Sequence, residues 1–223
     1  MSSGHRQIKT GVPDGTAVAY TYNAAGRRVR QSVSAQVTIY LWNELSPYGD
    51  VVLETDESES KLASYVLGGA EMLSQTHGGA TSYYLHDGQG SVRNLMDGSG
   101  AVTDTYAYTA FGELYAQTGT TANAYLHTGQ QFDSLIGLYS LHARYYDPAM
   151  GRFLSRDTAK LALMAPEEID RYVYTANNPI AAVDPGGLQA FVEYSEANQT
   201  SEEERVVIAC KLGSKPLPLG RPF

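Results

Sequence analysis

Short runs in which apolar and polar residues alternate follow one another along most of the chain, separated by turns that contain glycine. Residues 17–22 form one such run, and residues 101–108 form another. Alternation with a period of two is typical of strands with one buried face, and strand-like runs that recur about every 8 to 12 residues are typical of an all-β protein. The pattern predicts mainly β structure, an antiparallel ribbon, before residue 157.

A tyrosine followed four residues later by glycine marks several of the predicted turns. Residues 22–27 and 108–113 share this spacing, and residues 146–152 repeat it with one extra residue. Residues 87–90 and 97–100 are further glycine-containing turns between strand-like runs. Glycine supplies the positive φ that such turns need, and a preceding Asn or Asp tolerates the turn conformation. We therefore expect a series of hairpins.

One stretch near the C-terminal end carries helical signals. Residues 166–177 begin with a proline and two glutamates, which favour a helix start, and Asn178-Pro179 follows them. We expect one short helix there. After Leu188 the composition becomes polar and acidic, and it ends rich in proline. The sequence therefore predicts two parts, a body at residues 1–188 and a short variable tail at residues 189–223.

The composition agrees with a folded sheet protein. The chain has 223 residues, enough for one domain with a sizeable core and a short appendage. Hydrophobic residues make up 43% and charged residues 18%, which excludes a disordered chain. The 17 Tyr against 5 Phe and 1 Trp favour strands whose tyrosine rings are apolar along one side and wet at the hydroxyl tip.

The charge and the cysteine count exclude several classes of function. The formal net charge is -8, so the chain lacks the basic surface that a nucleic acid would need. Cys210 is the single cysteine, which excludes an internal disulfide and a cysteine-based zinc cluster. The N-terminus lacks the apolar segment of a signal peptide, and no run approaches the roughly 20 apolar residues of a membrane span. We expect no membrane span and an export route supplied from outside this chain.

Four blocks of the sequence resemble consecutive blocks of the RHS (YD-repeat) core, in the order of that family. They are YLHDGQGSVR at 84–93, GLYSLHARYYDP at 137–148, GRFLSRD at 151–157 and YVYTANNP at 172–179. The likeness runs from about residue 17 to residue 188. Polymorphic toxins, the C components of insecticidal toxin complexes, wall-associated proteins and teneurins are similar. The resemblance implies a β-ribbon that spirals into a hollow shell around a variable C-terminal toxin and is plugged by the core.

The residues themselves support only the ribbon. Alternating strands and turns are equally compatible with a β-sandwich or with an open sheet bound to a partner. A shell that holds a folded toxin needs many more strands than this chain contains, so we expect a C-terminal fragment or a truncated family member. Its first strand would leave an open edge, which upstream repeats or another shell chain would cover.

Residues 184–188, Asp-Pro-Gly-Gly-Leu, match the signature after whose leucine many members of the family cut themselves. The resemblance implies cleavage between Leu188 and Gln189 by an intramolecular aspartyl peptidase. Two neighbouring carboxylates can share a proton, so that one activates water while the other protonates the reacting peptide. The plain alternative is that Asp184 only makes a turn.

The second carboxylate has two candidates. Asp157 stands at the earlier aspartate position of the family and follows Arg156, whose guanidinium would hold a carboxylate ionised or bind an oxyanion. Asp170, beside Arg171, is the alternative. The family repeats its signature at the first aspartate, but residues 158–161 of this chain contain no proline or glycine. Self-cleavage is therefore a hypothesis to be tested.

Other chemistry finds no support in the sequence. The five histidines show no metal-ligand spacing. Residues 87–90 are rich in glycine but lack the lysine of a phosphate loop. No serine lies in the motif of a nucleophile elbow. We expect no metal and no cofactor.

Two functions remain open. In the first, the chain is the C-terminal core of a secreted or cell-surface bacterial protein that delivers a toxin; it forms part of a β-shell around a C-terminal polypeptide and cuts itself after Leu188. In the second, it is a non-enzymatic surface module whose tyrosine-rich faces bind carbohydrate or a partner protein. The mass of the purified chain would separate the two.

Overall fold

One antiparallel sheet of eleven strands dominates the structure, and each of its strands pairs with the next along the chain. The computed structural model describes residues 6–11, 16–43, 50–69, 71–158, 170–188 and 191–192. The predicted antiparallel β-fold is confirmed, and so are the turns within residues 22–27, 87–90 and 97–100. The strands are β1 (Arg6–Gly11), β2 (Ala17–Tyr22), β3 (Arg28–Val33), β4 (Gln36–Asn43), β5 (Asp50–Thr55), β6 (Lys61–Gly68), β7 (Glu71–His77), β8 (Ala80–His86), β9 (Val92–Met96), β10 (Val102–Tyr108) and β11 (Leu114–Thr118).

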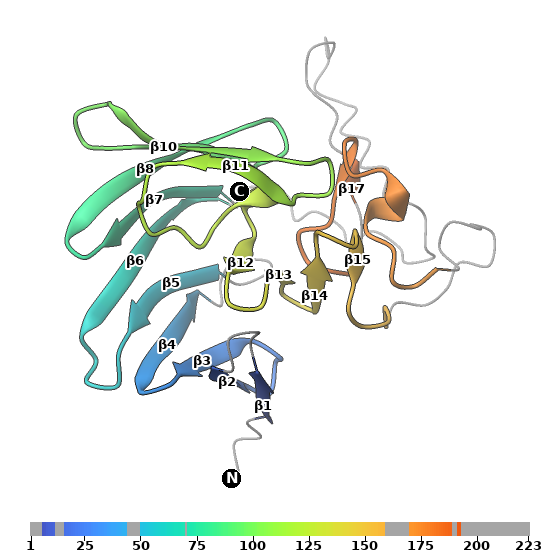
Figure 1. Cartoon of the computed structure of the whole chain (residues 1–223), viewed down its shortest axis with the longest axis horizontal. Coiled ribbons are helices and arrows are strands. Elements are labelled where there is room, and N and C mark those ends of the chain that lie inside the picture. Colours follow the sequence, from blue (N-terminus) through green and yellow to red (C-terminus); the bar gives the residue numbers. More distant parts are fainter. Residues whose placement is uncertain are drawn as a thin grey trace, which may run out of the picture.

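Two smaller sheets follow the long one. A four-stranded antiparallel sheet consists of β12 (Gln131–Asp133), β13 (Leu138–Leu141), β14 (Arg144–Asp147) and β15 (Arg152–Phe153), and β16 (Ala182–Val183) pairs with β17 (Phe191–Val192). Figure 1 shows the long sheet bent into an arc, with β12 on the inside of the bend. We call residues 122–153, which lead from the long sheet through β12–β15, the core segment.

The described part of the predicted helix at residues 166–177 does not form an α-helix. Residues 166–169 lie outside the described residues, and residues 170–177 contain a β-bridge and a single 3-10 turn, η3 (Thr175–Asn177). Val173 pairs with Arg152 of β15, which holds the chain extended, and all three residues of η3 have positive φ. Both features exclude a right-handed helix. Within the described residues, no helix is long and apolar enough to cross a membrane.

Five hairpin turns of the long sheet share one hydrogen-bond pattern. In each, the first residue donates its N–H to the carbonyl four residues later and accepts at its own carbonyl from the N–H three residues later. Its side-chain oxygen also accepts from the backbone N–H four residues later. The fourth residue has a φ between 62° and 88°, which favours glycine. The first residues of the five turns are Asn23, Asp56, Asp87, Asp97 and Thr109.

Glu59 is the one fourth residue of these five turns that is not glycine, and its φ is 62°. Glu59→Gly is expected to raise the free energy of unfolding by about 1 kcal/mol, because glycine has no Cβ to clash in this conformation. Gly100→Ala is the matched reversal. A Cβ at residue 100 would meet nothing within 4 Å, so the expected decrease of about 1 kcal/mol in the free energy of unfolding comes from the backbone conformation alone. Urea denaturation measures both, and a loss of stability in Glu59→Gly would contradict the common turn geometry.

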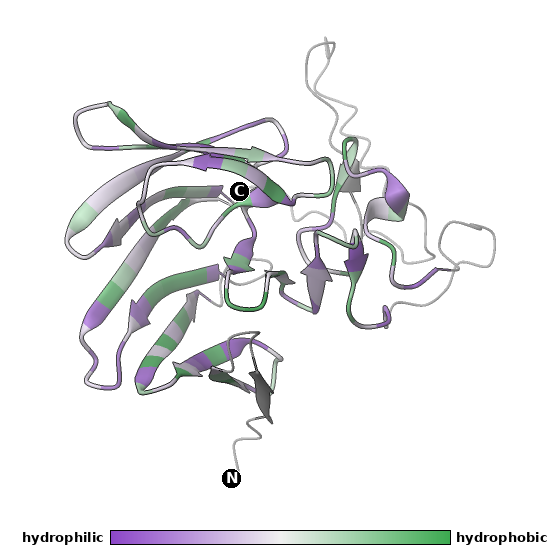
Figure 2. Cartoon of the chain, in the orientation of Figure 1, coloured by the Kyte–Doolittle hydropathy of each residue, from purple (hydrophilic) through white to green (hydrophobic). Residues whose placement is uncertain are grey.

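The long sheet buries one face and exposes the other. Figure 2 shows hydrophobic and hydrophilic positions alternating along β3 and β4. On the inner face, every second strand contributes one buried tyrosine, and the core segment packs on these rings through residues such as Tyr125 and Leu126. On the outer face, Val66, Tyr83 and Val102 are exposed. The buried tyrosines are Tyr20, Tyr40, Tyr65, Tyr84 and Tyr106 on β2, β4, β6, β8 and β10.

Four of these five tyrosines donate their hydroxyl to a protein side chain, which corrects the expectation that the hydroxyls are wet. Three of them donate to a polar side chain on the preceding strand, at 2.7 to 2.9 Å. The pairs are Tyr40 with Gln31, Tyr65 with Glu54, and Tyr84 with Gln75. Burial raises the pKa of Glu54, and the bond from Tyr65 opposes that shift. The repeated bond fixes each ring against its neighbouring strand and satisfies the hydroxyl away from water.

A buried ion pair joins the long sheet to the core segment. Arg28 of β3 lies with Nη1 2.5 Å from Oδ2 of Asp133 of β12, and both side chains are almost fully buried. The hydroxyl of Tyr20 donates to the same Asp133 oxygen at 3.0 Å, and Arg28 Nη2 donates to Gln131 at 3.1 Å. The guanidinium carbon also lies 4.9 Å from the ring centroid of Tyr40. These contacts fasten β12 to the inner face.

Asp133→Asn is expected to lower the free energy of unfolding by about 3 to 5 kcal/mol, because it leaves the Arg28 guanidinium buried without a counter-charge. Glu57→Gln is the control: its ion pair with Arg30 is about half exposed, and its loss is expected to cost less than about 1 kcal/mol. Chemical denaturation followed by tyrosine fluorescence measures both variants. Equal effects would show that the buried pair does not fasten the core segment.

Candidate functional site

Arg144 lies at the centre of a cluster formed by the C-terminal segments. It is on β14, in phase with the buried Tyr146, so its side chain points inward from the small sheet. Its Nη2 lies 2.9 Å from Oδ2 of Asp157 and 3.4 Å from Oδ2 of Asp184. One guanidinium therefore holds the two carboxylates that the sequence selected as the leading pair.

The other groups of Arg144 bind backbone carbonyls of the same segments. Its Nε donates to the carbonyl of Gly187, and its Nη1 donates to the carbonyl of Arg171 at 3.3 Å. Its guanidinium carbon lies 3.5 Å from the ring centroid of Phe153. Burial lowers the pKa of Arg144, while the charges of Asp157 and Asp184 oppose that shift. The guanidinium thus ties three chain segments to β14.

Asp184 both shapes a turn and contributes a carboxylate to the cluster. Its Oδ1 accepts the N–H of Leu188 at 3.1 Å, and its carbonyl accepts the N–H of Gly187 at 3.4 Å. The other oxygen, Oδ2, faces Arg144. The turn and the carboxylate pair are therefore compatible, because they use different atoms of one buried side chain.

The remaining predicted site residues divide between the cluster and the surface. Asp157 donates its N–H to the carbonyl of Arg171 at 3.0 Å, which brings its carboxylate to the cluster. Asp170 instead pairs with Arg152 at 2.8 Å on the surface, where both side chains are nearly half exposed. Arg156 is exposed. Of the candidates, the structure brings together Asp157 and Asp184, and the cation between them is Arg144.

Arg144 is not among the site residues predicted from the sequence, although a signal for it is present there. The run at 144–147 alternates, and Tyr146 marks its inward phase, so Arg144 occupies an inward position of a strand. A buried arginine requires counter-charges and acceptors. Arg144 could therefore have been predicted to lie against the aspartates that follow it in the sequence.

The candidate cleavage point follows a short strand. Ala182 pairs with Val192 and Val183 with Phe191, and the described residues 184–188 come directly after β16. Leu188 is exposed, and Gln189 lies outside the described residues. The predicted boundary at Leu188 stays a prediction, since most of the tail, residues 193–223, also lies outside them.

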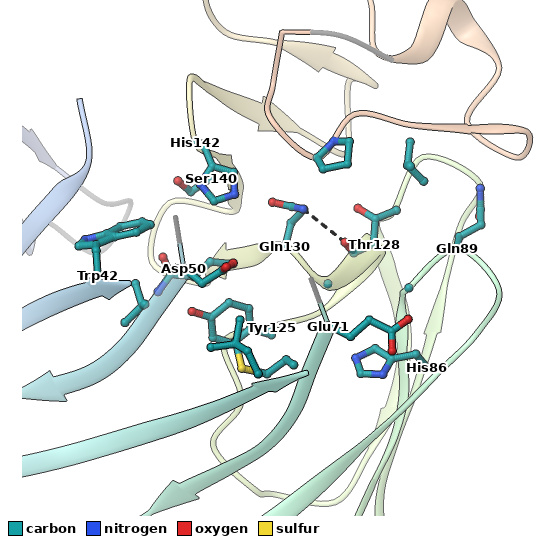
Figure 3. A pocket seen from close by; sticks show the side chains of 18 of the residues that line it. Trp42, Asp50, Glu71, His86, Gln89, Tyr125, Thr128, Gln130, Ser140 and His142 are labelled. Atoms are coloured by element: carbon teal, nitrogen blue, oxygen red, sulfur yellow. Dashed lines mark hydrogen bonds between the residues drawn. The ribbon is translucent and has the colours of Figure 1, made fainter. Parts of the chain in front are cut away.

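A separate cavity of about 250 Å³ lies between the long sheet and the core segment. Figure 3 shows the side chains of Trp42, His86 and His142 from both layers around it. It reaches Pro185, but neither Asp184 nor Arg144 lines it. Small-molecule pockets begin at about 300 Å³, so its size does not indicate a ligand. Where the chain is described, no group of three or more His, Cys, Asp or Glu is placed to hold a metal.

A long antiparallel ribbon that is covered on its inner face by its own C-terminal segment defines a shell-forming repeat protein. Residues 4–180 match the family model described as Teneurin YD-shell. The chain belongs to the RHS (YD-repeat) family.

Curated relatives come from bacteria and animals. The chain is 34% identical over 172 residues to the tRNA3(Ser)-specific nuclease WapA of Bacillus spizizenii, which covers 75% of this chain and 7% of WapA. It is 27% identical over 174 residues to Teneurin-4 of Mus musculus, which covers 75% of this chain and 6% of that protein. The chain thus spans less than a tenth of the length of these relatives.

A solved structure shares the fold. The crystal structure of TcdB2-TccC3 without its hypervariable C-terminal region matches with a TM-score of 0.59 and 20% identity. The match covers 82% of this chain and 10% of that chain. At this identity the likeness shows that the two chains share the shell fold.

Tyr174 is the aromatic support of the cluster. Its ring is buried, lies 4.4 Å from the ring centroid of Tyr146, and follows the exposed Tyr172 in the sequence. Tyr174→Ala is expected to lower the free energy of unfolding by about 3 to 5 kcal/mol and to open residues 170–188 to proteases. Tyr172→Ala is expected to change stability by less than about 0.5 kcal/mol. Denaturation and limited proteolysis measure both, and equal digestion of the two variants would show that these residues are not docked.

Proposed function

We propose that this chain is the C-terminal core of an RHS shell protein, and that it cuts itself between Leu188 and Gln189 with Asp157 and Asp184. The observation that carries the proposal is the Arg144 guanidinium, which binds both carboxylates and the carbonyl of Gly187. The guanidinium thereby links the two carboxylates to the carbonyl of Gly187, one residue before the peptide that would be cut. A turn alone needs neither Asp157 nor Arg144.

The two carboxylates have different access to water, which suggests their roles. The side chain of Asp157 is 18% exposed, while that of Asp184 is 3% exposed and holds the N–H of Leu188. Asp157 is the better placed to deprotonate a water molecule, and Asp184 to act as the acid. Arg144 lies against both carboxylates and offsets the repulsion between them.

In the proposed reaction, water adds to the carbonyl carbon of Leu188 and gives its proton to the Asp157 carboxylate. The bond from that carbon to the nitrogen of Gln189 then breaks, and the nitrogen takes the proton held by Asp184. The products are a carboxyl group on Leu188 and an amine on Gln189. The reacting groups belong to one chain, so their effective concentration is high.

The altered sequence after Asp157 is compatible with this role. Thr158 stands where the family has proline, and it is exposed. The carboxylate of Asp157 is positioned by the bond from its own N–H to the carbonyl of Arg171, which needs no proline after it. The departure at residue 158 therefore removes no contact that holds the carboxylate.

The shell and its contents belong to a longer assembly in this proposal. The arc of eleven strands is too short to close, and β1 and β11 each have one strand partner among the described residues. Upstream repeats or another shell chain would pair with the outer edge of β1. The enclosed polypeptide would be the tail, residues 189–223, or a larger toxin in a relative of this chain. Delivery of this kind implies a secreted or cell-surface protein.

The alternative is a non-enzymatic surface module. One observation favours it. The carboxylate of Asp184 accepts the N–H of Leu188, and a simple turn would explain that contact. In this case the exposed outer face, which includes Tyr83 and Tyr115, would bind carbohydrate or a protein.

Purified protein is expected to release a tail that begins at Gln189 without added protease, as measured by intact mass. Asp157→Asn and Asp184→Asn are each expected to slow release by at least about 100-fold, because a pair with one ionisable carboxylate cannot serve as both base and acid. Asp170→Asn is the matched control, and its rate is expected to be unchanged since Asp170 pairs with Arg152 on the surface.

The rate should not depend on protein concentration, because the reaction is intramolecular. Release that rises with concentration would point to a contaminating protease. An intact mass for the folded, unmutated protein after long incubation would leave the non-enzymatic module as the better account.

A further inference from the structure

Residue 187 lies against backbone that leaves no room for a side chain. A Cβ built on Gly187 would lie 2.1 Å from the carbonyl oxygen of Leu141 and 3.2 Å from the nitrogen of Arg144. Both atoms belong to the hairpin of β13 and β14, whose strands are paired on both sides, so neither can move aside as a flexible side chain would. The φ of Gly187 is +69°, a conformation that other residues rarely adopt.

The same close approach brings residue 187 to the guanidinium. The carbonyl of Gly187 accepts from Nε of Arg144, and the carbonyl of Gly186 accepts from the N–H of Ala143 at 3.3 Å. A side chain at position 187 would push the loop away from the hairpin and break these two bonds. It would thus separate the peptide at Leu188 from the guanidinium that holds the carboxylates.

Position 188 is held differently. The N–H of Leu188 donates to Asp184 at 3.1 Å, whereas its side chain is 44% exposed. The contact that positions this residue is therefore one that every residue except proline can make.

We propose that cleavage requires a residue without a side chain at position 187 and a backbone N–H at position 188. It does not depend on the leucine side chain. Gly187 is the specificity-determining residue, because the backbone of Leu141 and Arg144 leaves no space for a Cβ at this position. The substrate class is a Gly-Xaa segment that is cut after Xaa, where Xaa is any residue except proline. This inference rests on the proposed self-cleavage and defines what that reaction selects.

The test measures the rate of tail release by intact mass for four variants of the whole chain. Leu188→Ala and Leu188→Gln are expected to cleave within about tenfold of the unmutated rate, since no binding energy from the side chain is lost. Leu188→Pro, which lacks the N–H, and Gly187→Ala, which displaces the loop, are expected to slow release by about 100-fold or more. Circular dichroism checks that each variant is folded.

The position-188 variants keep the test decisive even if Gly187→Ala fails to fold, because they alter an exposed side chain. Cleavage of the unmutated protein together with loss of cleavage in folded Leu188→Ala would overturn this inference and leave the proposed function standing. Normal cleavage of Leu188→Pro or of Gly187→Ala would also overturn it. An unmutated protein that never cleaves would overturn the proposed function, and this inference with it.

Discussion

The inner face of the long sheet is covered by the chain's own core segment, and the ion pair between Arg28 and Asp133 fastens the two together. A single sheet has no partner layer, so its buried face must find cover elsewhere. Much of this face consists of tyrosines whose hydroxyls need acceptors, and the odd-numbered strands supply several of them. The core segment therefore packs on a face that already contains many polar groups. The buried ion pair is tolerated there because Tyr20 donates to Asp133, Gln131 accepts from Arg28, and the rings of Tyr20 and Tyr40 lie against the guanidinium.

A second buried guanidinium organises the other end of the core segment. Arg28 joins two sheets, whereas Arg144 joins three stretches of chain that carry little regular structure of their own. Directed bonds from one planar cation hold these stretches in place, together with the buried rings of Phe153 and Tyr174. The same geometry that holds Asp157 and Asp184 in place also brings them to the loop at Leu188, which is why structural support and candidate chemistry cannot be separated at this site.

The sequence predicted the strands and turns well because both depend on neighbours in the chain. Alternation and the glycine four residues after tyrosine are local signals, and the sheet obeys them. The predicted helix at residues 166–177 relied on local signals too, but Val173 pairs with the distant Arg152, and that pairing overrides them. The sequence favoured Asp157 over Asp170 by its position in the family's motif, but it did not show that Asp157 faces Arg144 while Asp170 pairs with Arg152. Those pairings depend on contacts across the fold.

The five matching turns have a consequence for how such proteins change in length. Each turn satisfies its own backbone within five residues, and Tyr40, Tyr65 and Tyr84 each bond to the strand before their own. A hairpin is therefore a self-contained unit, and one can be gained or lost without altering the bonds inside its neighbours. Duplication or deletion of whole hairpins would lengthen or shorten the ribbon in steps.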